Sequence, residues 1–207
     1  ILYIQYRLET GFETKESKTL VSLKDTVFTA VKDISNNDIV NPTIETKERF
    51  KNLRTNLMTS VIGQNEAIDK VASAIQSAKY GIKDKNKPLA TMLFLGKTGT
   101  GKTLLAKKLA ENVFGSKNFF KFDMSEYDTE ISSSKLLGSN PGFVGYNESS
   151  PLQTAIKNNP FSVFLFDEIE KAHPKILDLF LQLLDEGRIT TNNKVTLNFT
   201  NAIIIMT

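Results

Sequence analysis

The stretch GKTGTGKT at residues 96–103 constrains the fold of this chain more than any other part of the sequence. A short apolar run of buried-strand type, ATMLFL, precedes it, and apolar residues at helical spacing follow it in LLAKKLAENVFG. An ordinary glycine turn is the alternative interpretation. Strand, glycine loop and helix in this order, however, are the context that the pattern Gly-x4-Gly-Lys-Thr requires. The stretch therefore predicts a site for the phosphates of a nucleotide.

The residue types of this loop fit the chemistry of a bound triphosphate. Glycines let backbone N–H groups curl around phosphate oxygens, and the helix N-terminus adds a favourable dipole. Lys102 is expected to reach the β- and γ-phosphates, and Thr103 to ligate Mg²⁺, so ATP and Mg²⁺ are the expected ligands. The predicted phosphate-binding residues are Gly96, Lys97, Thr98, Gly99, Thr100, Gly101, Lys102, Thr103 and Leu104.

A second chemical feature is FSVFLFDEIEKAHP at residues 161–174, where a nearly continuous apolar run ends in Asp167 and Glu168. An Asp-Glu pair at a strand end is, by itself, more often a solvated turn. Together with a phosphate loop it predicts a functional pair at the same edge of the sheet. Asp167 is expected to hold Mg²⁺. Glu168 is expected to orient or deprotonate the water that attacks the γ-phosphate.

Composition sets the limits for these expectations. The chain has 207 residues, of which 40% are hydrophobic and 24% charged, which suits one ordinary domain plus some extra chain. The net charge is only +3, and lysines cluster only in KDKNK, so a solvated loop is favoured over a nucleic-acid footprint. The chain has no cysteine, which excludes disulfides and thiolate zinc sites. No apolar run is long enough to cross a bilayer, and the opening residues lack the features of a secretory signal.

Expected strands and helices alternate along most of the chain, and this alternation predicts the α/β fold class with a parallel sheet covered by helices on both faces. Ligands of such sheets bind at the carboxyl ends of the strands. The expected strands are 90–95, 119–123, 161–166 and 202–206, and the expected helices are 65–80, 102–114, 130–137, 151–158 and 174–186. Residues 1–57 are interpreted as a preceding linker with a candidate helix at 20–34, and residues 58–207 as the ATPase core. A helical stretch is also expected at 44–60.

Six motifs resemble the second ATPase module of the Clp ATPases, which are AAA+ unfoldases of the ClpA, ClpB and ClpC type, and the ClpC type is taken as the nearest. The match covers about residues 58–207. The motifs are VIGQ, GKTGTGKT, FDMSEY, LLGSNPGFVGY, LFDEIEKAHP and DEGRIT, and they occur in the family's order. The resemblance implies a P-loop NTPase fold of the AAA+ large-subdomain type.

The resemblance also implies a function and partners. It implies a homo-hexameric ring that uses ATP hydrolysis to pull unfolded polypeptide through a central pore. Such a ring serves as a chaperone or as the regulatory subunit of a Clp protease with a ClpP-type peptidase. Carried over by position, Lys102 and Thr103 bind phosphate and Mg²⁺, Asp167 holds Mg²⁺ and Glu168 is the catalytic carboxylate. Val61 and Ile62 of the VIGQ motif line the adenine pocket.

A glycine-flanked aromatic matches the loop with which the family grips its substrate. These residues are Gly142, Phe143, Val144 and Gly145, with Phe143 where the family usually has Tyr. The alternative is that Phe143 is a buried loop anchor. A large apolar side chain on a glycine-flanked loop suits the gripping of varied polypeptides, and the loss of the hydroxyl should leave this grip intact.

The sequence departs from the family pattern in places. Lys97 replaces the usual Pro of the glycine loop, and Thr191 stands where an acidic residue is common. The sensor residue, the arginine finger, a fifth strand and the helical lid of the family are expected beyond residue 207, so the large subdomain is expected to be incomplete at its C-terminus. An unpaired sheet edge and weak or absent ATPase activity of the isolated chain are therefore expected.

Two other functions remain open at this stage. One is an AAA+ ATPase that acts on nucleic acid, such as a helicase or clamp loader, but residues 136–155 around the expected pore loop carry no Lys or Arg. The other is a nucleotide-binding module that does not hydrolyse ATP. Neither nucleic acid nor a membrane is expected as a partner. Frequent Asn and Lys hint at an AT-rich genome, and the expected location is a bacterial cytoplasm or a bacterial-derived organelle of plastid or apicoplast type.

Overall fold

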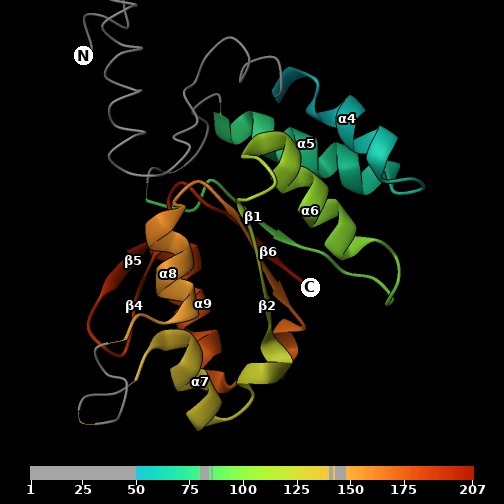
Figure 1. The fold of residues 1–207 in the computed structure, drawn as a ribbon. Coiled ribbons are helices and arrows are strands. Elements are labelled where there is room, and N and C mark those ends of the chain that lie inside the picture. Colours follow the sequence, from blue (N-terminus) through green and yellow to red (C-terminus); the bar gives the residue numbers. More distant parts are fainter. Residues whose placement is uncertain (1–49, 80–83, 85, 140–141, 143–147) are drawn as a thin grey trace, which may run out of the picture. The chain divides into compact units, whose positions relative to one another are not determined.

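A parallel four-stranded sheet with strand order β1-β6-β3-β2 organises the protein (Figure 1). The computed structural model describes residues 50–79, 84, 86–139, 142 and 148–207. The chain divides into two compact units, 1–43 and 44–207, and all the described residues belong to the second. Among the described residues, no helix is long and apolar enough to cross a membrane.

Helices and strands alternate along the described part of the chain as the sequence predicts. The strands are β1 (Ala90–Leu93), β2 (Phe119–Asp123), β3 (Val163–Asp167), β4 (Arg188–Thr190), β5 (Thr196–Asn198) and β6 (Ile203–Met206). The α-helices are α4 (Leu53–Ser60), α5 (Asn65–Lys79), α6 (Lys102–Val113), α7 (Glu130–Leu137), α8 (Pro151–Asn158) and α9 (Pro174–Glu186), and the 3₁₀ helices are η1 (Met124–Tyr127) and η2 (Ile169–Lys171).

The two central strands, β3 and β6, supply side chains to both faces of the sheet. Because neighbouring residues of a strand point to opposite faces, Phe164 and Ile204 belong to one hydrophobic cluster and Leu165 and Ile205 to the other. All four side chains are fully buried. Strands buried on both faces read as continuous apolar runs, which is why FSVFLF and AIIIM lack alternation.

Different helices cover the two faces (Figure 1). The aliphatic cluster joins the sheet to α4, α5 and α6. The other cluster is rich in phenylalanine and joins the sheet to α7, α8, α9 and the antiparallel hairpin β4–β5. The predicted parallel sheet with helices on both faces is therefore confirmed.

Local end signals explain the helix boundaries. Ser150 caps α8 in a reciprocal capping box, and Pro151 occupies its first turn. Gly187 ends α9 in the left-handed conformation with φ 62°. The expected bounds of α7, α8 and α9 match the structure.

The structure differs from several expectations. The strand expected at 161–166 spans Val163–Asp167, because the chain still bends at Pro160 and Phe161 and the Ser162 hydroxyl donates to the Asn159 carbonyl oxygen at 2.8 Å. The strand expected at 90–95 ends at Leu93. The hairpin β4–β5 was not expected, since each of its strands has only three residues. Within the helical stretch expected at 44–60, the structure has helix α4 at Leu53–Ser60, and this helix spans the expected boundary between residues 57 and 58. The division of the chain at 57/58 stays a prediction, and the expected helix at 20–34 lies outside the described residues.

Candidate nucleotide site

The glycine loop lies between β1 and α6, at the carboxyl end of its strand, as predicted. Gly99 and Gly101 have φ angles of 81° and 90°, in the left-handed region that other residues rarely adopt. An added Cβ would meet no atom within 4 Å at either position. The loop therefore needs glycine for its backbone conformation, and the space above the loop stays open.

The side chain of Lys102 folds back over the loop that precedes it. Its Nζ donates to the carbonyl oxygens of Gly96 at 2.7 Å and of Lys97 at 3.1 Å. The Thr100 hydroxyl donates to the Lys97 carbonyl oxygen at 2.8 Å, and Gln64 Nε2 donates to the Thr100 carbonyl oxygen at 3.1 Å. These bonds shape the loop around an ammonium group. An anion could take the place of the carbonyl partners of Lys102.

The N-terminus of α6 is suited to an anion. Gly101 is its N-cap, offers no side-chain cap, and the first turn carries no acidic residue. The N–H groups of a helix's first turn have no partner within the helix, and the helix dipole makes this end positive. Backbone donors, a dipole and the Lys102 ammonium thus lie together. This donor set fits a triphosphate.

Asp167 ends β3 and is bound by a neighbouring strand on each side. Lys121 of β2 forms an ion pair with its Oδ2 at 2.6 Å, and the Thr207 hydroxyl, just after β6, donates to its Oδ1. Burial acts to raise the pKa of Asp167, but the hydrogen bonds from Lys121 and Thr207 outweigh it, and the pKa lies below its ordinary value. The hydrogen bond to Asp167 raises the pKa of Lys121. Both groups are therefore charged at neutral pH.

Glu168 follows directly and has an unusual backbone. Its φ of 56° is left-handed, which is strained for a residue with a side chain. Two hydrogen bonds stabilise this backbone conformation. The Glu168 N–H donates to the Thr207 hydroxyl oxygen at 3.2 Å, and the Ile169 N–H donates to the Thr207 carbonyl oxygen at 3.0 Å. The carboxylate is half exposed and pairs with Lys171 at 2.5 Å. Lys171 pairs with Oε2, and an ionised carboxylate has a second oxygen with which to meet a water molecule.

Two oxygen donors are available for a magnesium ion. The Thr103 hydroxyl is exposed at the start of α6, and Asp167 is ionised. Hard oxygen ligands of this type suit Mg²⁺. In the described part of the chain, no group of three or more His, Cys, Asp or Glu could hold a metal ion alone. The residues therefore fit a metal that arrives with phosphate oxygens, as Mg²⁺ usually does.

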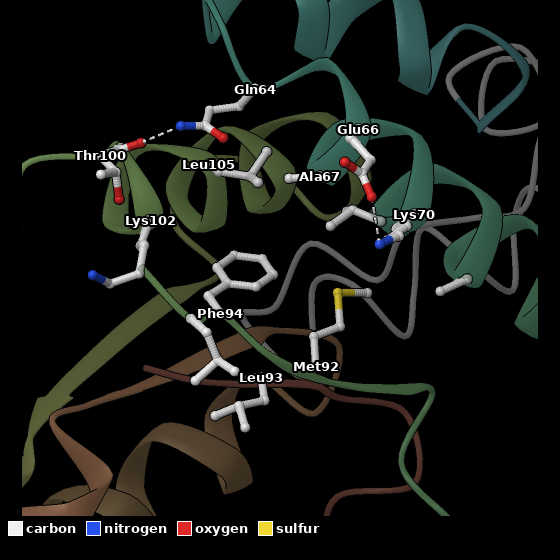
Figure 2. Close-up of a pocket in the computed structure, with 14 residues that line it drawn as sticks. Gln64, Glu66, Ala67, Lys70, Met92, Leu93, Phe94, Thr100, Lys102 and Leu105 are labelled. Carbon is white, nitrogen blue, oxygen red and sulfur yellow. Dashed lines mark hydrogen bonds and ion pairs between the residues drawn. The ribbon is translucent and has the colours of Figure 1, made fainter. Parts of the chain in front are cut away.

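A cavity of about 550 Å³ lies beside the glycine loop, between α5 and β1 (Figure 2). Met92 of β1, Phe94 just after it and Leu105 of α6 line the cavity with apolar groups, and the exposed Glu66–Lys70 ion pair of α5, at 2.7 Å, lies at one side. Thr100, Gly101 and Lys102 form the end nearest the loop. An apolar cavity that ends at hydrogen-bond donors for a phosphate is suited to a flat ring attached to a phosphate chain.

Two expected groups of residues lie elsewhere or cannot be placed. Val61 is buried in the aliphatic cluster, whereas Ile62 is 91% exposed, and neither lines this cavity. Their adenine-pocket role stays a prediction. Of the expected pore loop, Gly142 is exposed, while Phe143, Val144 and Gly145 lie outside the described residues.

The sequence did not reveal Lys121 and Thr207 as residues of this site. One signal was available, because Lys121 is the only charged residue inside the apolar strand FFKF. A lysine there needs an acidic partner or solvent. The contact of Thr207 joins residues far apart in the chain, and no local pattern marks it. Gln64 belongs to the predicted VIGQ motif, but its hydrogen bond to Thr100 was not expected.

The sheet, the glycine loop and the paired carboxylates define a P-loop nucleoside triphosphatase fold. A family model described as an AAA domain of the Cdc48 subfamily matches residues 87–207, and a torsin model matches residues 37–130. Since the first match covers more than half of the chain, the chain belongs to this family of AAA domains.

Curated proteins similar to this chain include bacterial Clp proteins. The chaperone protein ClpB of Clostridium tetani is 49% identical over 162 residues, which are 78% of this chain and 19% of that protein. ClpB of Aquifex aeolicus is 45% identical over 193 residues, covering 93% and 19%. The ATP-dependent Clp protease ATP-binding subunit ClpE of Lactococcus lactis is 48% identical over 157 residues, covering 75% and 21%. The chain thus spans about a fifth of the length of these relatives, and the resemblance to Clp ATPases is confirmed.

Proposed function

We propose that this chain is the ATP-binding and ATP-hydrolysing module of a ring-forming protein unfoldase. The observation that carries the proposal is that one edge of the sheet holds both an open phosphate loop after β1 and an ionised Asp167, followed by Glu168, at the end of β3. The names of the relatives, a chaperone and a Clp protease subunit, support the unfoldase over an ATPase acting on nucleic acid.

In this proposal, the loop residues 96–104 surround the phosphates through backbone N–H groups. Lys102 exchanges its carbonyl partners for phosphate oxygens. Thr103 and Asp167 hold Mg²⁺, which neutralises phosphate charge. Glu168 orients the attacking water. The cavity between α5 and β1 is a candidate for the base, beside the predicted contributions of Val61 and Ile62.

The substrate and partners follow from the same proposal. The segment Gly142–Gly145, with Phe143 at its centre, grips unfolded polypeptide, and six copies of the parent protein form the ring. A ClpP-type peptidase is the proposed partner if the parent resembles ClpE or ClpC rather than ClpB. The relatives named above are bacterial, which supports a bacterial cytoplasm; a plastid-type organelle stays the finer alternative.

The test is calorimetric titration of the chain with Mg²⁺ and a non-hydrolysable ATP analogue. Lys102→Ala is compared with Lys107→Ala, an exposed lysine of the same helix that lies outside the site. We expect Lys102→Ala to weaken binding about 100-fold, because a charge-assisted contact to phosphate is lost. Lys107→Ala should bind like the unsubstituted chain. Equal affinity of the two variants would contradict the proposed phosphate site.

The nucleic-acid alternative is tested with a fluorescent single-stranded DNA at two salt concentrations. The unfoldase proposal expects no binding that weakens steeply with salt, because the described surface around α7 and α8 offers few cations. Salt-dependent binding that competes with an unfolded polypeptide would instead favour the alternative.

A further inference from the structure

The β4–β5 hairpin ends in a turn, residues 191–195, that contacts both ends of another segment. This segment, 139–149, joins α7 to α8 and includes Gly142–Gly145. The last residues before it and the first residues after it are described, and hydrogen bonds tie both to the same turn. The turn therefore occupies a position from which it can set the separation of the two helix ends.

On the α7 side, the turn satisfies carbonyl groups that the helix leaves unpaired. The Asn192 N–H donates to the Leu137 carbonyl oxygen at 3.2 Å, and its Nδ2 donates to the Gly138 carbonyl oxygen at 2.8 Å. The last carbonyls of a helix have no partner within it, so donors from elsewhere are needed when they are buried. Gly138, with φ 88°, also packs on Asn193, whose Cγ would lie 3.4 Å from an added Cβ.

On the α8 side, Gln153 serves two purposes at once. Its Oε1 accepts from the Ser150 N–H at 2.9 Å and so closes the capping box of α8. Its Nε2 donates to Asn193 Oδ1 at 2.7 Å and to the Thr191 hydroxyl oxygen at 3.2 Å. Gln153 is 1% exposed and Thr191 is 4% exposed. Buried polar groups in such a network are costly to leave unpaired, so the network resists opening.

The turn is itself closed by internal hydrogen bonds. The Thr191 N–H donates to the Val195 carbonyl oxygen at 3.0 Å, and the Val195 N–H donates to the Thr191 hydroxyl oxygen at 3.2 Å. Beneath the turn, Ile189 and Leu197 of the hairpin pack in the same cluster as Leu137 and Leu152 of the two helices. The turn thus rests on the core and cannot shift without disturbing it.

We propose that the turn 191–195 is a clamp that holds the end of α7 and the start of α8 at a fixed separation. Asn192 is the positioning residue on the α7 side, and Thr191 and Asn193 are those on the α8 side. The clamp rests on the proposed function in one respect: the segment whose ends it holds is the one proposed to grip polypeptide. A rigid base allows such a segment to transmit force to what it holds.

The clamp is tested by measuring the separation of the helix ends directly. The chain has no cysteine, so Lys135→Cys on α7 and Ser149→Cys before α8, both exposed, allow spin labels at two unique sites. Pulsed electron paramagnetic resonance gives the distribution of distances between the two spin labels. Asn192→Asp removes the side-chain donor to Gly138, and Thr191→Val combined with Asn193→Leu removes the acceptors of Gln153 Nε2. We expect either change to broaden the distribution about twofold, because the helix ends open locally.

Two control variants separate the clamp from general effects on folding. Asn198→Asp makes the same change elsewhere in the hairpin and keeps the acceptor for the Thr200 N–H, so it should leave the distribution unchanged. Thr191→Ser keeps the hydroxyl and should also preserve it. An unchanged distribution in both clamp variants, at a melting temperature equal to that of Asn198→Asp, would overturn the clamp.

Amide hydrogen exchange of the chain without substitutions or labels tests the clamp even if the clamp variants unfold. If the turn and both helix ends form one unit, the backbone amides of Asn192 and Ser150 exchange hydrogen at similar rates. Rates that differ by about 100-fold would show independent opening and would overturn the clamp.

The gripping role is tested separately, by photo-crosslinking from a benzophenone attached at Gly142→Cys to carboxymethylated α-lactalbumin, which is permanently unfolded. We expect the chain labelled at Gly142→Cys to crosslink. The same labelled chain with Asn192→Asp should crosslink about fivefold less, because its helix ends are no longer held together. No crosslink from the labelled chain without Asn192→Asp would count against the proposed function. The distances between the spin labels would then be the test of the clamp.

Discussion

Two turns of this molecule use polar groups in opposite ways: the glycine loop 96–101 and the clamp turn 191–195. The glycine loop is mostly exposed, and its hydrogen bonds run between its own backbone carbonyls and the side chains of Lys102, Thr100 and Gln64. In the clamp turn, buried side-chain groups meet other side chains and backbone groups. Among the described residues, no buried side-chain nitrogen or oxygen lacks a partner.

The difference separates a turn built for a ligand from one built for structure. Donors that are to meet a phosphate must be available, so the glycine loop keeps the first turn of α6 uncapped. A turn that holds two helices gains most when every buried polar group is satisfied, because an unpaired group is costly. The same elements, glycine at positive φ and a helix end, therefore serve opposite purposes.

The largest expected effect comes from ligand binding at the glycine loop alone. A non-hydrolysable ATP analogue with Mg²⁺ at about 100 times its dissociation constant should stabilise the protein by about 2.7 kcal/mol. Hydrogen exchange should slow more at residues 99–104 than at 191–195, because only the former lie at the ligand. The measurement is denaturant unfolding together with amide exchange. Slowing at 191–195 without slowing at 99–104 would contradict the comparison.

The next effect compares two glutamines, one in each region. Gln153→Leu should destabilise the protein by about 2 kcal/mol, because Ser150, Thr191 and Asn193 lose partners in a buried network. Gln64→Leu should cost about 0.5 kcal/mol or less, because its bond to the Thr100 carbonyl oxygen is exposed. Urea unfolding measures both. Equal losses would show that the glycine loop is held as firmly as the clamp.

A smaller effect compares two glycines that both have positive φ angles, 81° at Gly99 and 88° at Gly138. Gly99→Ala should cost about 1 kcal/mol, because a side chain is disfavoured at such an angle. Gly138→Ala should cost more, because its ψ of 154° places it in a region that is almost restricted to glycine. Thermal unfolding measures the difference. If the two variants melt together, the backbone at Gly138 adapts, and the clamp is less rigid than proposed.

The smallest effect is the dependence on pH of the ion pair between Lys121 and Asp167. Lys121→Met should lose about 0.5 kcal/mol at neutral pH, since this pair is only partly buried. The lowered pKa of Asp167 means that this loss fades as the pH falls below about 3.9 and through that lowered pKa. The raised pKa of Lys121 means that it also fades as the pH rises above about 10.4.

Unfolding of Lys121→Met across the pH range checks this expectation, with Lys117→Met as the control for losing an exposed lysine. A loss of stability that does not change at either extreme of pH would show that Lys121 acts through packing and not through its charge.

Local signals predicted most of the fold. Ser150 before Pro151 and the glycine at 187 are sequence signals for helix ends and lie at the start of α8 and the end of α9, and the apolar runs before Gly96 and Asp167 are strands of a parallel sheet. The hairpin β4–β5 was missed because its strands are three residues long and partly polar. It is held in place by tertiary contacts, such as the burial of Ile189 and Leu197 in the phenylalanine-rich cluster.

The sequence by itself determined which residues stand at this edge of the sheet: a glycine loop with Lys102 and Thr103, and a strand that ends in Asp167 and is followed by Glu168. These are contiguous patterns, and local backbone preferences are enough to form them. Only the tertiary structure decided which groups hold Asp167. Strand register places Lys121 of β2 and Thr207 after β6 on either side of it, although they lie 46 and 40 residues away in the chain. The clamp turn has the same origin, because packing brings Gln153 and Asn193 together across 40 residues.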